Sequence, residues 1–191
     1  MKLRDIIMIR GKIILETGLR IGGGDMEMRI GGVDNPVIKH PHTQEPYIPG
    51  SSLKGKVLSL LEMRSGLMIR TDGWPLSSNI LRDEGESKLN EDQKSECKKI
   101  LQLFGISGAD STDGKDPLIR EIGPTRVSFS DARLNEEWMK GALGQGWSLT
   151  EVKSENRINR ISGTAKDPRF TERVSRAMVI DHLGGVRGQL I

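Results

Sequence analysis

Apolar and polar side chains alternate through residues 2–17 and again through residues 126–130. Because successive side chains of a strand point to opposite faces, this period of two predicts strands of a half-buried sheet at both places. Residues 51–65 instead repeat apolar side chains at helical spacing, which predicts a helix with one buried face. A further helix is expected at residues 90–104.

The C-terminal part of the chain changes character. Residues 151–174 alternate in charge around two isoleucines and contain the turn signal Ser162-Gly163, which predicts an extended basic hairpin. Leu183–Gly188 is expected to form a glycine-rich turn that carries an arginine. Trp138 and Trp147 are expected to be buried in the core or in a subunit contact. Two strands, a helix and a hairpin together favour an α+β fold built on a small antiparallel sheet.

The length of 191 residues predicts one domain, residues 1–191, with room for sizeable insertions. Residues 71–118 are polar and carry charged loops, so we expect this segment to be such an insertion. Only 35% of the residues are apolar and 23 are glycine. Much of the chain should therefore be loop, or surface that meets a partner.

The sequence contains no apolar run that approaches the length of a membrane span, and its first residues lack a secretory pattern. Cys97 is the single cysteine, so an internal disulfide is impossible and a reducing compartment is expected. These features predict a cytoplasmic protein with no membrane partner.

The net charge of +3 is unevenly distributed. All of the excess falls in residues 151–191, which hold eight basic and five acidic side chains. Five arginines lie within residues 156–176, a density that favours contact with phosphate groups. A solvated basic face would have a similar composition.

Two glycine-rich stretches form a near repeat, Arg20–Asp25 and Arg29–Asp34. Each places a carboxylate after glycines, where the backbone can approach a ligand closely. On spacing alone, Asp25 and Asp34 are equivalent candidates, and an aspartate after glycine is also a common turn residue.

Ser51 and Ser52 follow Pro49-Gly50 at the expected start of a helix. Either serine would cap that helix, and the free N–H groups of its first turn would suit a phosphate. Carboxylate, glycines and anion site together suggest that the ligand has a polyphosphate backbone.

Other chemistry has weaker support in the sequence. His40 and His42 could supply two metal ligands, but Cys97 is remote in sequence, which argues against a structural zinc site. The three Trp, three Phe and one Tyr are few, which argues against a site that works mainly by stacking bases on aromatic platforms.

Several motifs occur in a characteristic order. They are Gly31-Gly32-Val33-Asp34-Asn35-Pro36, Pro49-Gly50-Ser51-Ser52-Leu53-Lys54-Gly55, Asn156-Arg157-Ile158-Asn159-Arg160 and Leu183-Gly184-Gly185 with Arg187-Gly188. This series resembles the RAMP-superfamily backbone subunit of type III-A CRISPR (Csm) effector complexes. The resemblance covers nearly the whole chain.

The resemblance implies an RRM-like, ferredoxin-type palm (βαββαβ), an inserted fingers region at residues 71–118 and a β-hairpin thumb at residues 151–174. Two departures from the family pattern are visible. Arg20 stands where family members usually have a histidine. The C-terminal strand and helix that usually separate the thumb from the final glycine motif are shortened here, because Leu183 follows Val174 within nine residues.

In function, the resemblance implies a repeated subunit that binds the CRISPR guide RNA and cleaves complementary target RNA at regular intervals. Asp34 is then the catalytic residue of a metal-dependent endoribonuclease, with Mg²⁺ or another divalent cation beside it. The implied partners are guide RNA, target RNA, further copies of this chain in a filament, and the large polymerase-like, small and guide-tag-binding subunits. The candidate RNA contacts are Arg20, Ser51, Ser52, Lys54, Lys56, Arg157, Arg160, Lys166, Arg169, Gly184, Gly185 and Arg187.

Three other functions remain open from the sequence. The first is a non-catalytic, structural guide-RNA-binding subunit. The second is a stand-alone CRISPR RNA-processing ribonuclease, against which the scarcity of histidine argues. The third is a small-molecule phosphate enzyme, which lacks the strand–GxGxxG–helix context that such a site needs.

Overall fold

The computed structural model describes residues 5–23, 33–82, 89–106, 116–175 and 179–187. The chain forms two compact units, which are considered separately below. Unit 1 consists of residues 1–9, 50–130 and 184–191, and unit 2 of residues 10–49 and 131–183. Strands β1 (Ile6–Ile14) and β6 (Val179–Arg187) each contribute residues to both units.

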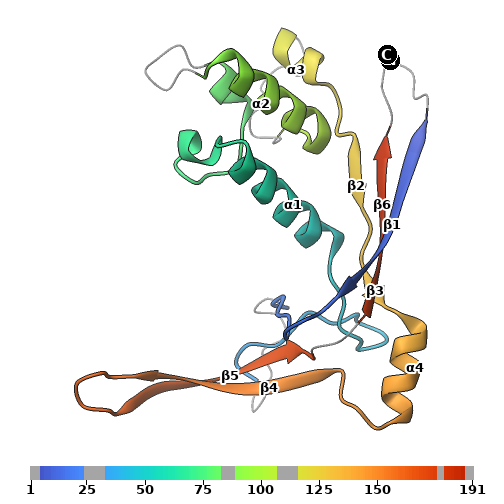
Figure 1. Ribbon diagram of the computed structural model, residues 1–191, viewed down its shortest axis with the longest axis vertical. Coiled ribbons are helices and arrows are strands. Elements are labelled where there is room, and N and C mark those ends of the chain that lie inside the picture. Colours follow the sequence, from blue (N-terminus) through green and yellow to red (C-terminus); the bar gives the residue numbers. More distant parts are fainter. Residues whose placement is uncertain (1–4, 24–32, 83–88, 107–115, 176–178, 188–191) are drawn as a thin grey trace. The chain divides into compact units, whose positions relative to one another are not determined.

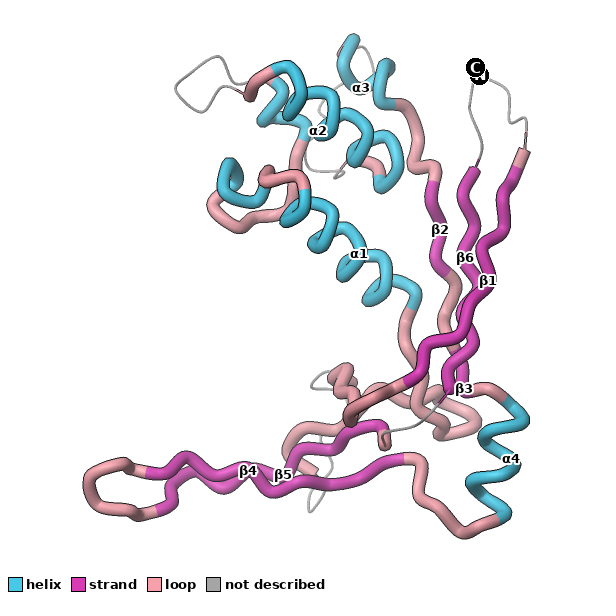
Figure 2. Tube along the Cα trace, viewed as in Figure 1, coloured by secondary structure: helices cyan, strands magenta, loops and turns pink. Residues whose placement is uncertain are grey.

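The main sheet has the strand order β1-β6-β2, and β3 (Arg133–Leu134) also pairs with β6. Figure 2 shows β1, β6 and β2 (Val127–Phe129) running side by side. In unit 1, β2 pairs antiparallel with β6, with Val127 opposite Val186. In unit 2, β3 pairs antiparallel with β6. The predicted α+β fold on an antiparallel sheet is confirmed.

The expectation of a turn at Leu183–Gly188 is wrong, because residues 183–187 belong to strand β6. Gly184 and Gly185 lie opposite Phe129 and Ser128 in the ladder. Glycine disfavours a strand only by its conformational freedom, and regular pairing with a neighbouring strand can offset that cost. The partner strand lies more than fifty residues away in sequence, so the local pattern could not reveal it.

Unit 1 contains the helices α1 (Gly50–Arg64), α2 (Glu91–Phe104) and α3 (Pro117–Ile122). The helices predicted at residues 51–65 and 90–104 are confirmed. Two short 3-10 helices, η2 (Met68–Thr71) and η3 (Ser78–Leu81), connect α1 to the segment before α2. Figure 1 shows α1 and α2 next to each other.

The core of unit 1 draws on both α1 and the segment predicted to be a polar insertion. Its buried members are Leu67, Leu76, Leu89, Cys97, Ile100, Leu101, Phe104 and Ile122. Val57 and Leu61 of α1 pack against this cluster, as does Phe129 of β2. Most of the apolar side chains described within residues 71–118 therefore contribute to a shared core, with Trp74 as an exposed exception.

The start of α1 depends on a glycine. A Cβ atom built on Gly50 would lie 2.2 Å from the carbonyl oxygen of Phe129. Only glycine therefore allows α1 to approach the end of β2 this closely. The helix begins at Gly50 itself, so the prediction that Ser51 or Ser52 caps it is wrong, and both serines lie inside the first turn.

Unit 2 contains α4 (Glu136–Gly144) and a second, two-stranded antiparallel sheet formed by β4 (Thr150–Ile158) and β5 (Ala165–Val174). These strands form the hairpin that Figure 1 shows as a long two-stranded arm. Trp138 is half-buried. Trp147 is 55% exposed, so it is not part of the core of this chain, and its alternative place in a subunit contact stays a prediction. It follows the turn that ends α4, at Gly146 (φ 72°).

Strand β1 exposes apolar side chains on both faces. Ile6, Ile7, Met8 and Ile9 are all between 53% and 59% exposed. Such a surface on an edge strand offers unpaired backbone groups and apolar contact to other chains. Among the helices of the described residues, none is both long and apolar enough to cross a membrane.

Candidate nucleic-acid interface and catalytic loop

Asp34 lies in a loop that is fixed against the base of the hairpin. One carboxylate oxygen of Asp34 accepts a hydrogen bond from the backbone N–H of Phe170, at 2.8 Å. The neighbouring Asn35 donates its backbone N–H to the Phe170 carbonyl at 3.2 Å and accepts from the Glu172 N–H at 3.0 Å. The loop thus pairs with β5 as a short parallel strand would, which places an exposed carboxylate at a defined point beside the hairpin.

Arg20 belongs to the same arrangement. Its guanidinium donates a hydrogen bond to the side-chain oxygen of Asn35 at 2.9 Å. The backbone of the Arg20 segment is anchored as well, since Leu19 and Val174 exchange two backbone hydrogen bonds of 2.7 and 3.1 Å. Arg20 is therefore linked through the Asn35 side chain to the residue that follows Asp34 in the loop.

Next to this loop, the carboxylate of Glu172 is buried, and the sequence analysis did not predict it. The side chain of Glu172 is 8% exposed and forms an ion pair of 2.6 Å with Lys39. Its second oxygen accepts the backbone N–H of Val37 at 3.1 Å. Glu172 therefore links β5 to the segment that follows Asp34. Glu172 is one of four acidic residues in the charge-alternating stretch 151–174, and nothing in the local sequence distinguishes it from the other three.

The ionised form of Glu172 is favoured in the folded chain. Burial raises the pKa of this carboxyl, but its hydrogen bonds from Lys39, Val37 and Thr150 and the charge of Lys39 lower it by more. The net result is a pKa below the usual value of 4.5. At neutral pH, Glu172 is therefore a charged anchor, not a proton donor.

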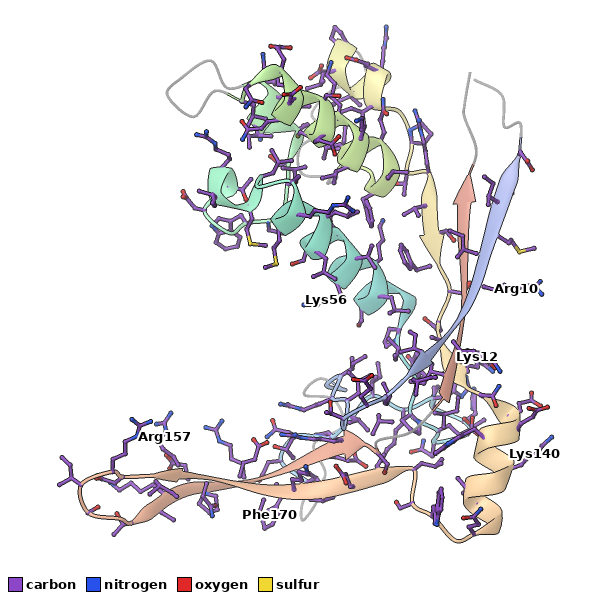
Figure 3. All side chains as sticks on the ribbon, in the orientation of Figure 1. Arg10, Lys12, Lys56, Lys140, Arg157 and Phe170 are labelled. Carbon is purple, nitrogen blue, oxygen red and sulfur yellow. The ribbon has the colours of Figure 1, made fainter. Side chains whose placement is uncertain are left out.

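The hairpin presents its basic side chains to solvent. Arg157, Arg160, Lys166 and Arg169 are all exposed, and none of them forms an ion pair within the described residues. Arg157 lies directly opposite Lys166 in the ladder, and like charges in that position destabilise a hairpin. Figure 3 shows the Arg157 side chain extending from the distal half of the arm. An anionic partner would relieve this repulsion.

The first two turns of α1 carry four further predicted contacts. Ser51, Ser52 and Lys56 are exposed and Lys54 is half-buried; Figure 3 shows Lys56 projecting from the helix. The first turn of α1 contains no acidic residue of its own, whereas α2 and α4 each have two in their first turns. The positive end of a helix dipole attracts anions, and the side chains of this turn do not oppose that attraction.

Some predicted site residues are described only in part, or lie outside the described residues. Gly184, Gly185 and Arg187 fall within strand β6 of unit 1, and only their backbone is described. Asp25, the second candidate carboxylate, lies outside the described residues. Asp34 and Arg20 belong to unit 2, together with the hairpin, while Ser51–Lys56 belong to unit 1.

The donor set around Asp34 limits the kind of metal site. Among the described residues, no three His, Cys, Asp or Glu side chains are placed to hold a metal ion. His40 and His42 lie in unit 2, and Cys97 is buried in the core of unit 1. A single carboxylate does fit Mg²⁺, which keeps several waters and commonly uses one or two carboxylates with substrate phosphates.

Comparison with known proteins identifies the class. The profile of the RAMP superfamily matches residues 12–178. The chain therefore belongs to the RAMP superfamily.

Within that class, the similar curated proteins are named CRISPR system Cms endoribonuclease Csm3. The Csm3 of Enterococcus italicus is 35% identical over 92% of this chain and 68% of its own length. The Csm3 proteins of Methanothermobacter thermautotrophicus and Streptococcus thermophilus are 36% and 37% identical, each over 92% of this chain, and are covered over 66% and 65% of their length. The chain thus spans about two thirds of these relatives.

Solved structures agree on the fold. The crystal structure of Methanopyrus kandleri Csm3 aligns with 97% of this chain and 64% of its own, at a TM-score of 0.52 and 22% identity. A cryo-EM structure of apo type III-B Cmr-beta aligns with 96% of this chain and 85% of its own, at a TM-score of 0.57 and 12% identity. At these identities the similarity shows the fold alone, and it is consistent with an RRM-like palm.

Proposed function

We propose that this chain is a repeated backbone subunit of a type III-A CRISPR effector complex, which binds guide RNA and cleaves complementary target RNA with Asp34 as the catalytic residue. The observation that carries the proposal is the position of Asp34, an exposed carboxylate held by hydrogen bonds at the base of a basic hairpin. Relatives that are 35–37% identical are named Csm3 endoribonucleases, which supports the same activity here.

The chemistry asks little of the protein beyond geometry. The 2′-hydroxyl of RNA can attack the adjacent phosphorus while the 5′-oxygen leaves, provided that a nucleotide is turned out of the helical stack into the in-line arrangement. The hairpin, with its exposed cations, would bind the phosphates on either side of that nucleotide. Arg20 would stabilise negative charge on the phosphate through its guanidinium.

Asp34 has two possible roles that are compatible with its position. The oxygen that does not bond Phe170 could accept the proton of the 2′-hydroxyl directly. Alternatively, the carboxylate would hold Mg²⁺ or another divalent cation through its hydration shell. Such a cation, when bound, supplies charge stabilisation at the phosphate oxygens. Glu172 and Asn35 keep the Asp34 loop in register with β5 in either case.

The guide would be held without regard to its sequence. Exposed lysine, arginine and serine groups on the hairpin and on the first turn of α1 suit the phosphate backbone, which is the same for every guide. We propose that copies of the chain stack along the guide in the cytoplasm. The large polymerase-like, small and guide-tag-binding subunits would complete the complex.

The test is cleavage of a guide-matched target RNA by the reconstituted complex, with and without Mg²⁺. Periodic products are expected from the wild type, and they should decrease at least about 100-fold with Asp34→Ala, the lower range for loss of a general base. A single 2′-deoxy substitution at one cut site should abolish that product alone. Full activity of Asp34→Ala would disprove the catalytic assignment.

A non-catalytic, structural subunit remains the second candidate, because the hydrogen bond from Phe170 gives Asp34 a purely structural use. The variant Asp34→Asn separates the two. Asparagine keeps an oxygen that can accept the Phe170 N–H but removes the charge. If Asp34 acts in catalysis, Asp34→Asn loses cleavage while guide binding persists. If wild type binds target RNA and leaves it intact, the chain is a scaffold.

A further inference from the structure

Unit 1 carries a groove that the proposed site does not use. It is an open groove of about 520 Å³, within the range of small-ligand sites. Its lining residues are Arg70, Thr71, Trp74, Pro75, Ser77, Asn79, Ile80 and Arg82. All of them belong to η2, to η3 or to the residues between and beside these two elements.

Trp74 is the dominant feature of this groove. Its side chain is 75% exposed, which is costly for the largest apolar surface of any residue unless a partner covers it. Ile69, in the preceding element η2, is 83% exposed. Because most of the Trp74 side chain is exposed, packing in the core of unit 1 does not explain why a tryptophan occupies this position.

The backbone holds Trp74 in place. Thr71 and Trp74 are joined by a backbone hydrogen bond of 2.9 Å, from the Trp74 N–H to the Thr71 carbonyl. The Thr71 hydroxyl donates to the Trp74 carbonyl at 2.6 Å. Between them, Asp72 (φ 50°) and Gly73 (φ 80°) adopt left-handed conformations, as a tight two-residue turn requires. The backbone that carries Trp74 is thus positioned before any ligand arrives, which lowers the entropic cost of binding.

The charged side chains that line the groove are both arginines, which favours an anionic ligand. Arg70 is exposed and has no ion-pair partner within the described residues. The Arg82 guanidinium already donates hydrogen bonds to the side chains of Asn79 and Asp116. No acidic residue lines the groove. A flat apolar ring beside one free guanidinium matches a nucleotide, whose base stacks while its phosphate is paired.

We propose that this groove binds a nucleotide of single-stranded RNA, with the base stacked on Trp74 and the phosphate paired with Arg70. The proposal rests on the RNA-binding function above and adds a second contact to it. A protein partner fits less well, because Thr71, Ser77 and Asn79 give the groove a polar lining around a single aromatic ring.

The experiment measures binding of a fluorescein-labelled 12-nucleotide polyuridine RNA to the full chain by fluorescence anisotropy. Trp74→Ala should weaken the affinity about five- to 150-fold, the range expected from loss of one stacked base. Trp74→Phe should retain most of the affinity. Arg70→Gln should weaken binding and reduce the salt slope by about 1. Trp147→Ala is the matched control, because Trp147 is 55% exposed and lines no part of this groove.

A second measurement does not depend on any variant. Ultraviolet crosslinking of a 5-iodouridine version of the same RNA to the wild-type chain should place an adduct on Trp74, detected by mass spectrometry. Absence of that adduct, or unchanged affinity of Trp74→Ala, would refute the proposed nucleotide site in the groove. If the wild type still binds RNA in that case, the proposed function is unaffected. If wild type binds no RNA, alone or in the complex, the proposed function fails instead. If Trp74→Ala impairs association of chains without RNA, the groove is a protein interface and the proposal is wrong.

Discussion

The clearest energetic prediction concerns Glu172, which links the segment following Asp34 to the hairpin. Replacing it by glutamine keeps its shape and removes its charge. The two carboxylate oxygens now accept from Lys39 at 2.6 Å and from the Val37 N–H at 3.1 Å. Glutamine offers one acceptor and one donor, so one of these two hydrogen-bond donors must face the new amide hydrogens.

The magnitude follows from these contacts. Hydrogen bonds to a charged group contribute about 1.5–3 kcal/mol each. Glutamine replaces one with a weaker neutral bond and loses the other, while Lys39, at 27% exposed, can partly recover hydration. We expect Glu172→Gln to lower the free energy of unfolding by about 2 kcal/mol, or Tm by about 4–8 °C for a chain of this size.

The effect should depend on pH in a defined direction. The pKa of Glu172 is lowered in the folded chain, so its ionised form contributes stability above the usual value of 4.5. That contribution disappears as the pH falls further, through the folded pKa. Thermal unfolding of wild type and Glu172→Gln, followed by circular dichroism, should therefore differ at pH 7 and converge in acid.

Glu155 provides the matched control. It lies on the neighbouring strand β4 and pairs with Arg173, but its side chain is 49% exposed. An exposed ion pair contributes about 0–1 kcal/mol, so Glu155→Gln should change Tm little. Equal stability of wild type and Glu172→Gln at pH 7, or a difference that does not change with pH, would refute the reasoning.

Three further predictions concern unit 1 and strand β1. Gly50→Ala should lower the free energy of unfolding by about 1–3 kcal/mol, because the added methyl group meets the Phe129 backbone. Gly55→Ala in the same helix has open space around it and should raise that free energy by about 1 kcal/mol. Urea unfolding of the two variants and the wild type measures both changes. Cys97, whose pKa burial raises to about 12, should resist iodoacetamide at pH 8 until urea unfolds the chain; modification without urea, seen by mass spectrometry, would contradict the buried position. Ile7→Lys, at a side chain that is 57% exposed, should reduce self-association in light scattering and leave Tm within about 2 °C.

Much of the secondary structure could be predicted from the local sequence. Helices α1 and α2 and strand β2 follow from the periodicity of residues near them, because a helix or strand face needs only neighbours in sequence to define it. The hairpin β4–β5 coincides with the charge alternation around Ser162-Gly163. The glycines of β6 misled the sequence reasoning, since their role depends on β2, a strand distant in the chain.

The candidate site divides in the same way. The sequence nominated Asp34 through its motif, Arg20 through the glycine-rich near repeat, and the hairpin cations through their density in residues 151–174. It could not show that Asp34 bonds Phe170, a residue 136 positions away, or that Glu172 is buried. Trp74, too, had no signal in the sequence, because the exposure of one tryptophan depends on how the segments around it pack.

The sequence by itself determined the local elements, the family and the chemical groups available for contact with RNA. Short-range periodicity and motif order need no knowledge of distant segments. Only the tertiary structure decided which carboxylate is an exposed candidate and which is a buried anchor, because Asp34 and Glu172 differ in their long-range neighbours and not in their local chemistry. The physical reason is that burial and pairing arise when segments far apart in the chain come into contact.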